Sequence, residues 1–97
     1  MMVKVIGLME LIDQSAFEQY RSQVGQTVEL YKGSIKNRGS VAELFWNELG
    51  IAPFSTFVEL EFTEIQDAHA WANSPEYQTL VHIRSQAMKL TLFSIAI

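Results

Sequence analysis

The sequence predicts an α+β domain in which four strands form one antiparallel sheet and two helical regions pack on one face of that sheet. Strand-like and helix-like apolar periodicities alternate along the chain in the order β-α-β-β-α-β, and two polar segments, DQS and NSPE, have the composition of helix starts. Hydrophobic residues make up 48% of the 97 residues, with no polar linker or internal repeat. We therefore expect a single domain over residues 1–97.

The first strand and first helix are predicted on either side of Asp13. Residues 3–12, VKVIGLMELI, are rich in β-branched side chains and are followed by polar residues, so they indicate a strand. Asp13 is a suitable N-cap for the helix that follows. Apolar residues then recur at spacings of three and four, namely Phe17, Tyr20, Val24, Val28 and Tyr31. Gly33 is expected to end this helix.

The second and third strands are predicted on either side of a turn. Residues 34–46 indicate a strand, and the RGS segment in its middle indicates a glycine bulge. Gly50 and Pro53 are expected to turn the chain. Residues 54–62, FSTFVELEF, alternate between two faces, which is typical of a strand with one buried face.

The second helical region is predicted to break once. Thr63 is its expected N-cap, because acidic residues follow it in what would be the first helical turn. Ser74 and Pro75 suit the N-cap and first position of a new segment, so the helix should stop and restart there. Residues 89–97, KLTLFSIAI, then form the last strand. This order of elements is that of the ferredoxin-like fold.

The first and last strands carry apolar residues on both faces of the predicted sheet. Ile6 and Leu8 lie opposite the core-facing side of the first strand, as do Phe93 and Ile95 on the last. Water should not face such a surface, so something must cover it. We expect a homodimer in which two sheets meet face to face, a dimeric α/β barrel.

The composition excludes several classes of function. The chain has no cysteine, which excludes disulfides and thiolate chemistry, and it has neither a metal-binding histidine spacing nor a phosphate-binding glycine loop. We therefore expect no metal and no cofactor. The net charge of −4 argues against nucleic-acid binding, and no apolar run is long enough to span a membrane. A cytoplasmic protein without nucleic-acid or membrane partners is expected.

Two glutamates form the most notable polar pair. Glu59 and Glu61 lie on the strand face turned away from the helices, about 7 Å apart by strand geometry. A dimer would partly bury them, so they should pair with Lys36 and Arg38 from the neighbouring strand. The structural interpretation is an ion pair that sets the register of the barrel. The functional one makes Glu61 a catalytic general base or polar anchor and lets Arg38 hold an anionic substrate.

Several segments resemble the domain-of-unknown-function 1330 family of the dimeric α/β barrel superfamily. They are DQSAFEQY, IKNRGS, VELEF and SPEYQTLVHIR, and together they span nearly the whole chain. The SPEYQ segment with its trailing Arg84 is the most specific of them, whereas Ser40 stands where the family usually has a glycine. The resemblance implies the fold and the dimer. It implies no catalytic residues, because the family's chemistry is not established.

Heme-degrading enzymes of the same superfamily resemble the chain around WANS. Trp71 matches a tryptophan of these enzymes. His82, however, lies one residue beyond the position of their heme-ligating histidine, which is about 100° around a helix, and the first strand lacks their asparagine. Heme cleavage is therefore the weaker alternative.

The remaining candidates have structural interpretations beside functional ones. Aromatic stripes usually pack in the core, and an arginine near a helix end usually caps it or pairs with a carboxylate. The candidate ligand-binding residues are Arg38, Glu59, Glu61, Trp71, Tyr77, His82 and Arg84.

Two functions stay open. The first is a homodimer that binds a small molecule, including an anionic one, in a pocket of the barrel or between the sheet and the helices, without established catalysis. The second is a cofactor-independent monooxygenase or isomerase of the dimeric-barrel type. A pocket with convergent polar groups favours an enzyme, whereas a filled interior favours a binding or structural role.

Overall fold

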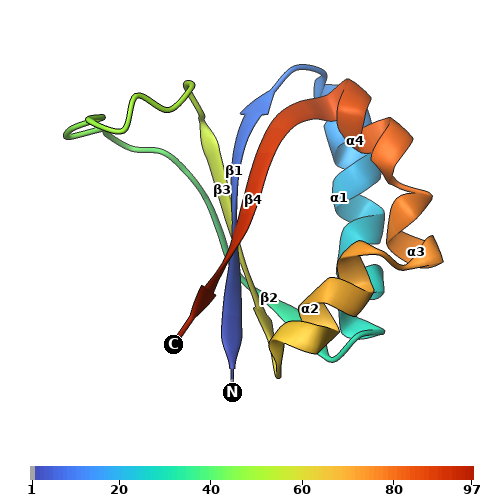
Figure 1. The fold of residues 1–97 in the computed structure, drawn as a ribbon. Coiled ribbons are helices and arrows are strands. Elements are labelled where there is room, and N and C mark those ends of the chain that lie inside the picture. The colour runs from blue at the N-terminus through green and yellow to red at the C-terminus, as the bar shows by residue number, and fades with distance from the viewer. Residues whose placement is uncertain (1) are drawn as a thin grey trace.

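The computed structural model of the protein describes residues 2–97 as one antiparallel sheet with all helical segments on one face (Figure 1). The elements are β1 (Val3–Leu11), α1 (Gln14–Glu29), β2 (Gly33–Ser40), β3 (Thr56–Phe62), α2 (Ile65–Ala72), α3 (Pro75–Gln78), α4 (Val81–Ala87) and β4 (Met88–Ala96). The strand order is β2-β3-β1-β4. The predicted ferredoxin-like arrangement is confirmed. The second helical region is divided twice, into α2, α3 and α4, where the sequence predicts one break.

Two of the three predicted helix caps are confirmed. The Asp13 carboxylate accepts a hydrogen bond from the Ala16 N–H at 3.1 Å, and the Ser74 hydroxyl accepts one from the Tyr77 N–H at 3.0 Å, with Pro75 at the first helical position. The prediction for Thr63 is wrong. Glu64 occupies the N-cap position of α2 instead, because its carbonyl accepts the first backbone hydrogen bonds of that helix. The Glu64 side chain forms no capping hydrogen bond.

β2 differs from its prediction in length and in the place of its bulge. It begins at Gly33, which was expected to end the preceding helix, and it ends at Ser40. Just beyond β2, the Val41 N–H donates the last backbone hydrogen bond of this pairing to the Ser55 carbonyl, next to the start of the third strand, at 2.8 Å. Beyond this bond, residues 41–55, which we call the 41–55 arm, are not part of the sheet. β3 accordingly begins at Thr56.

The bulge lies between Ile35 and Asn37 rather than at the RGS segment. It inserts one residue and so exchanges the two faces of β2 beyond it. Asn37 is opposite Glu59, and Arg38 is opposite Val58 on the face covered by the helices. The prediction that placed Arg38 on the same face as the two glutamates is therefore wrong.

The core lies between the helices and the sheet face formed by alternate residues of β1, β3 and β4. Val28 and Phe62 are its largest fully buried side chains. Trp71 packs on Phe62 with ring centroids 5.6 Å apart and on Tyr77 at 4.4 Å. These aromatic contacts join α2 and α3 to the sheet.

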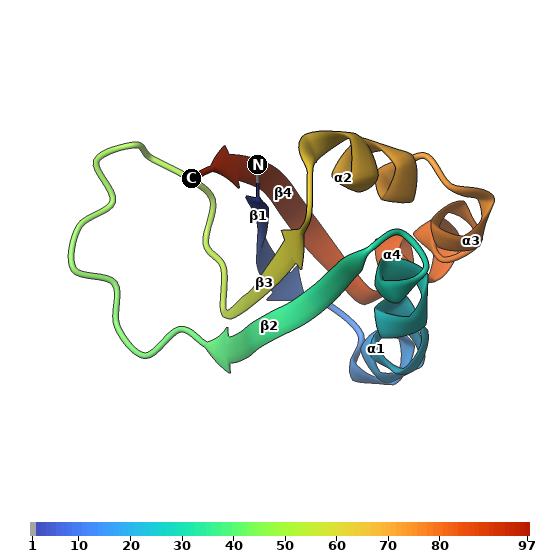
Figure 2. The ribbon, with the colours of Figure 1, turned by 90° about the horizontal axis from the view of Figure 1, so that it is seen from below.

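The opposite sheet face, which we call the outer face, has no helix over it (Figure 1). Phe93 and Ile95 of β4 are 42% and 43% exposed on it. Seen from below, the 41–55 arm extends beyond the sheet on the side away from the helices (Figure 2). Both features lie where the sequence predicts a second copy of the chain.

Candidate functional site: a cavity between the sheet and the helices

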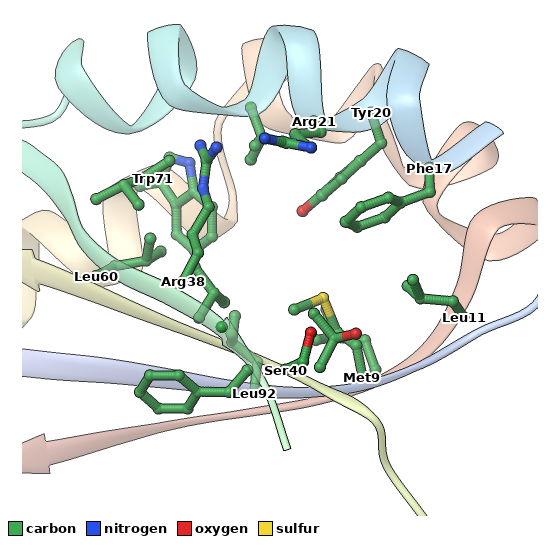
Figure 3. A pocket seen from close by; sticks show the side chains of 17 residues that line it. Met9, Leu11, Phe17, Tyr20, Arg21, Arg38, Ser40, Leu60, Trp71 and Leu92 are labelled. Atoms are coloured by element: carbon green, nitrogen blue, oxygen red, sulfur yellow. The ribbon is translucent and has the colours of Figure 1, made fainter. Parts of the chain in front are cut away.

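A cavity of about 340 Å³ lies between the inner face of the sheet and α1 (Figure 3). Its lining is largely apolar, and residues from β1, α1, β2, β3, α2 and β4 contribute to it. The large apolar side chains around it include Met9, Leu11, Phe17, Leu60, Trp71 and Leu92. A concave apolar site with a few polar groups is the usual form of a small-molecule pocket.

Two arginines are the charged residues of this cavity. Arg21 comes from α1 and Arg38 from β2, where the bulge turns it to this face, and Figure 3 shows both side chains extending along the cavity. Both residues are exposed, so their charged ends lie at the rim. Arg21 also lies 3.7 Å from the exposed Glu18, whereas Arg38 forms no ion pair within residues 2–97. No aspartate or glutamate lines the cavity.

Three side chains form a hydrogen-bonded series that ends at the cavity. Arg84 donates from Nη1 to the Tyr77 hydroxyl at 2.9 Å, and the Tyr77 and Tyr20 hydroxyls are 2.9 Å apart. Tyr20 and Tyr77 are buried, and their rings meet edge to face. Tyr20 lines the cavity, and Figure 3 shows its hydroxyl directed into it. Burial raises the pKa of Tyr20 far above its usual range, so its hydroxyl stays protonated.

Trp71 forms a wall of the cavity and is held in place from behind. Its indole N–H donates to the Thr27 hydroxyl of α1 at 3.0 Å, so this polar group is satisfied within the protein. The ring therefore offers an apolar surface to a ligand. Trp71 thus combines the two roles that the sequence left open, because it belongs to the core and forms a wall of the cavity. Tyr77 belongs to the core and does not line the cavity.

Glu59 and Glu61 lie away from this cavity, on the outer face. Their partner is Lys4 of β1, whose ammonium is 2.7 Å from Glu59 and 2.8 Å from Glu61. Lys36 is 3.9 Å from Glu61, and the Asn37 amide donates to Glu59 at 2.7 Å. The bonds from Lys4 and Asn37 hold the pKa of Glu59 below its usual range, and the two carboxylates raise the pKa of Lys4.

Arg38 is therefore not the partner of the two glutamates, contrary to the sequence-based prediction. The predicted pairing of Lys36 with the glutamates is seen for Glu61, which lies 3.9 Å from the Lys36 ammonium. The site residues predicted from sequence thus separate into two groups on opposite faces of the sheet. Arg38 and Trp71 line the cavity, Tyr77 and Arg84 lie behind it, and the glutamates lie on the outer face.

Comparison with known proteins gives a family. The model of a domain of unknown function, DUF1330, matches residues 4–96. The chain belongs to the DUF1330 family. No protein with a curated description matches it. Membership of this family and the fold do not specify an activity, which depends on the side chains of the site.

Solved structures with the same fold include proteins of unknown function and one oxygenase. RPA0582 of Rhodopseudomonas palustris, a protein of unknown function, superposes with a TM-score of 0.78 at 14% identity, over 97% of this chain and 80% of that one. A dimeric ferredoxin-like protein of unknown function from Jannaschia sp. CCS1 gives 0.70 at 10% identity over 100% of both chains. SnoaB of Streptomyces nogalater, a cofactor-independent oxygenase, gives 0.72 at 8% identity, over 99% and 92%. At these identities the likeness shows the fold alone.

His82 is the candidate that the structure separates from both groups. It is exposed on α4, where its ring nitrogen is 3.4 Å from the Gln86 amide. It does not line the cavity that contains Trp71. Within residues 2–97 of the DUF1330 chain, no group of histidine, cysteine, aspartate or glutamate side chains is arranged to hold a metal ion. No helix in the same range is long and apolar enough to cross a membrane.

Sequence reasoning missed three residues of these sites. Tyr20 fits the apolar stripe of α1, and its hydroxyl is not visible in that pattern. Arg21 follows it on a polar position, and nothing in the sequence shows that it lines a cavity. Lys4 could have been found by pairing the first and third strands in register, since it is opposite Glu61.

Proposed function

We propose that this DUF1330 protein is a homodimer that binds a small anionic molecule with an apolar body in the cavity between the sheet and α1. The observation that carries the proposal is the composition of the cavity, in which two arginines accompany an apolar lining without any carboxylate. In a protein of net charge −4, a cavity with only positive charges selects against cations and favours anions. We also propose that residues 1–97 form a single domain.

Arg38 is the residue best suited to bind the anionic group. It has no ion pair within the described residues 2–97, and its guanidinium offers several N–H donors in a plane that matches a carboxylate. Arg21 adds a second positive charge from the opposite wall. The apolar body of the ligand would contact Trp71 and Phe17. The affinity would come from apolar burial and the selectivity from the arginines.

The polar groups of the cavity favour binding over catalysis. They converge on one space, as an enzyme requires. The lining residues with a charge or a hydroxyl are Tyr20, Arg21, Arg38, Ser40 and Thr56. None of these is a general base near neutral pH, because the pKa of Tyr20 is raised and arginine does not deprotonate. The cavity can therefore hold and orient an anion.

The second candidate function is that of a cofactor-independent monooxygenase or isomerase. The fold shared with SnoaB and the presence of a cavity favour it. Glu61 would be its general base only in a second site formed on the outer face, where the partner subunit covers it. The ion pair with Lys4 holds the Glu61 carboxylate in place, which supports a structural role for Glu61 over a catalytic one.

Binding of 2-naphthoate, followed by its fluorescence, tests the proposed function. We expect 2-naphthoate to bind at least tenfold more tightly than the uncharged 2-naphthamide, because the arginines recognise the carboxylate. Arg38→Met should weaken binding of the acid by about 10-fold or more and leave the amide unchanged. Lys32→Met, which removes an exposed charge elsewhere, is the control. Equal affinity for acid and amide, or no binding of either, would contradict the proposal.

A further inference from the structure

The hydrogen-bonded series at the cavity contains more protons than acceptors. Arg84 donates to the Tyr77 oxygen, and each of the two tyrosine hydroxyls carries one proton. Only one proton can lie between the two hydroxyl oxygens. The other must find an acceptor outside the series or remain unpaired, which is unfavourable for a buried group.

The position of the two hydroxyls decides which proton is left over. Tyr77 is 2% exposed, and among the described residues its hydroxyl forms hydrogen bonds only with Arg84 and Tyr20. Tyr20 lines the cavity, so its proton can point to a ligand or to water there. The arrangement that leaves no buried proton unpaired therefore has Tyr77 donating to Tyr20 and Tyr20 donating into the cavity.

Arg84 strengthens this direction. Its guanidinium carbon is also 5.7 Å from the centre of the Tyr77 ring. A cation that donates to the Tyr77 oxygen makes the Tyr77 proton a better donor, and successive hydrogen bonds of this kind reinforce one another. Arg84 is thus a positioning residue that acts through Tyr77.

We propose that the Tyr20 hydroxyl donates a hydrogen bond to the ligand, and that the ligand is an acid whose apolar body carries a second oxygen able to accept it. This inference rests on the proposed function, because it concerns the same cavity. Arg21, Arg38 and Tyr20 all line the cavity (Figure 3). In this proposal the arginines bind the acidic group at the rim, and Tyr20 contacts an oxygen on the buried part of the molecule. Hydroxy- or oxo-substituted aromatic acids form this class.

Two naphthoates separate the Tyr20 contact from binding in general. We expect 6-hydroxy-2-naphthoate to bind the protein about 3- to 10-fold more tightly than 2-naphthoate, the usual effect of one hydrogen bond. In Tyr20→Phe the two acids should bind equally. Because the ratio is taken within each variant, a loss of folded protein does not alter it. Tyr31→Phe removes a hydroxyl that binds Glu76 outside the cavity and should keep the wild-type ratio.

A methyl ether tests the direction of the hydrogen bond in the wild-type protein. The oxygen of 6-methoxy-2-naphthoate can accept but not donate, so this acid should keep an advantage over 2-naphthoate if Tyr20 is the donor. Equal binding of the hydroxylated and unsubstituted acids, or the same ratio in Tyr20→Phe as in the wild type, would overturn the inference while leaving the anion site intact. Failure of every acid to bind would overturn the proposed function itself.

An independent observation concerns the 41–55 arm. Its base is fixed by the bonds of Ser55, which donates to the Met9 carbonyl at 2.9 Å and accepts from Val41 at 2.8 Å. Its tip is closed by Asn47, whose side chain exchanges hydrogen bonds of 3.0 and 3.1 Å with the backbone of Ile51. The arm is thus a formed structure that extends from the sheet on the side away from the helices (Figure 2).

This arm exposes large apolar side chains. Phe45, Trp46 and Leu49 are 74%, 80% and 91% exposed. Two aromatic side chains at this exposure offer roughly 300 Å² for burial, a large share of the roughly 800 Å² that one partner buries in a stable interface. The Phe45 and Trp46 rings lie side by side, with centroids 6.2 Å apart. Exposed apolar surface of this kind marks a contact with another protein surface.

We infer that the 41–55 arm binds a second copy of this chain, across the outer face. This inference rests on the proposed homodimer. Phe93 and Ile95 lie exposed on that face, and the arm extends on the same side of the sheet. The charged residues of the arm, Glu43 and Glu48, are acidic, and Lys89 on the outer face of β4 forms no ion pair within residues 2–97. A second copy supplies both complementary surfaces.

Sedimentation equilibrium of the wild type and of Phe45→Ser/Trp46→Ser tests this contact. We expect a wild-type dimer and at least a 100-fold larger dimer dissociation constant for the double variant, since central aromatic residues dominate interface energies. Leu30→Ser, which changes an exposed leucine of the helical layer, should leave the dimer unchanged. A dimer of unchanged strength in the double variant would overturn the role of the arm. A monomeric wild type would overturn the homodimer as well.

Discussion

Replacing Phe62 by alanine is expected to lower the free energy of unfolding by about 3–5 kcal/mol. Phe62 is 1% exposed at the end of β3, where its ring packs on Trp71 with centroids 5.6 Å apart. Alanine would leave a cavity between the sheet and α2 that the surrounding structure cannot fill. Urea denaturation followed by circular dichroism, at one protein concentration for all variants, measures the change.

The scale of this effect follows from the size of the protein. Domains of about this length have a total stability of roughly 5–15 kcal/mol, so the substitution removes a large part of it. The melting temperature should fall by about 12 °C or more. Leu30→Ala is the control, because Leu30 is 65% exposed and its loss should change stability by less than about 0.5 kcal/mol. A Phe62→Ala variant as stable as this control would contradict the assignment of Phe62 to the core.

Local chemistry accounts for the parts of the fold that were predicted. Asp13 and Ser74 satisfy backbone N–H groups a few residues away, so their role is visible in a short segment. The alternation of β3 reflects which face is buried, and Leu60 and Phe62 are indeed on the inner face. Such features depend on neighbours in the sequence, and they establish the number and order of the elements.

The errors with the largest consequences for the site concern contacts between distant segments. The place of the bulge depends on how β2 pairs with β3, and a glycine in RGS was the only local indication of one. Because the bulge is earlier, Arg38 moves from the outer face to the cavity. The sequence predicts that residues 41–46 continue the second strand, but β2 ends at Ser40, and Val41 and Ser55 form the last backbone hydrogen bond of this pairing.

The candidate site shows the same division. Trp71, Tyr77 and Arg84 stood out in the sequence because of their types and their place near the break in the second helical region. Tyr20 could not be associated with them from sequence, because its hydrogen bond joins residues 57 positions apart. The direction of the proton in that bond follows from the three-dimensional positions of the two hydroxyls, and Arg84 on the other side of Tyr77 strengthens it.

Gly33→Ala is expected to destabilise the protein by about 1–3 kcal/mol, the usual result of overpacking a filled core. A Cβ at Gly33 would lie 2.5 Å from one ring atom of Phe62 and 2.8 Å from a methyl group of Val28. Both neighbours are fully buried and have no space to move. Gly39→Ala, in the same strand, is the matched control. A Cβ there meets nothing within 4 Å, so this change should be neutral or slightly stabilising.

The cause of the Gly33 effect can be separated from a general loss of strand stability. Phe62→Leu shortens the side chain that the new Cβ would strike, at a modest loss of stability of its own. If the clash with the Phe62 ring is the cause, Gly33→Ala should lower the free energy of unfolding less in the Phe62→Leu protein than in the wild type, and the two changes should not add. Urea denaturation of the four proteins in this cycle gives the coupling directly. Strict additivity would show that the close approach of Gly33 to the Phe62 ring is not what excludes a side chain at position 33.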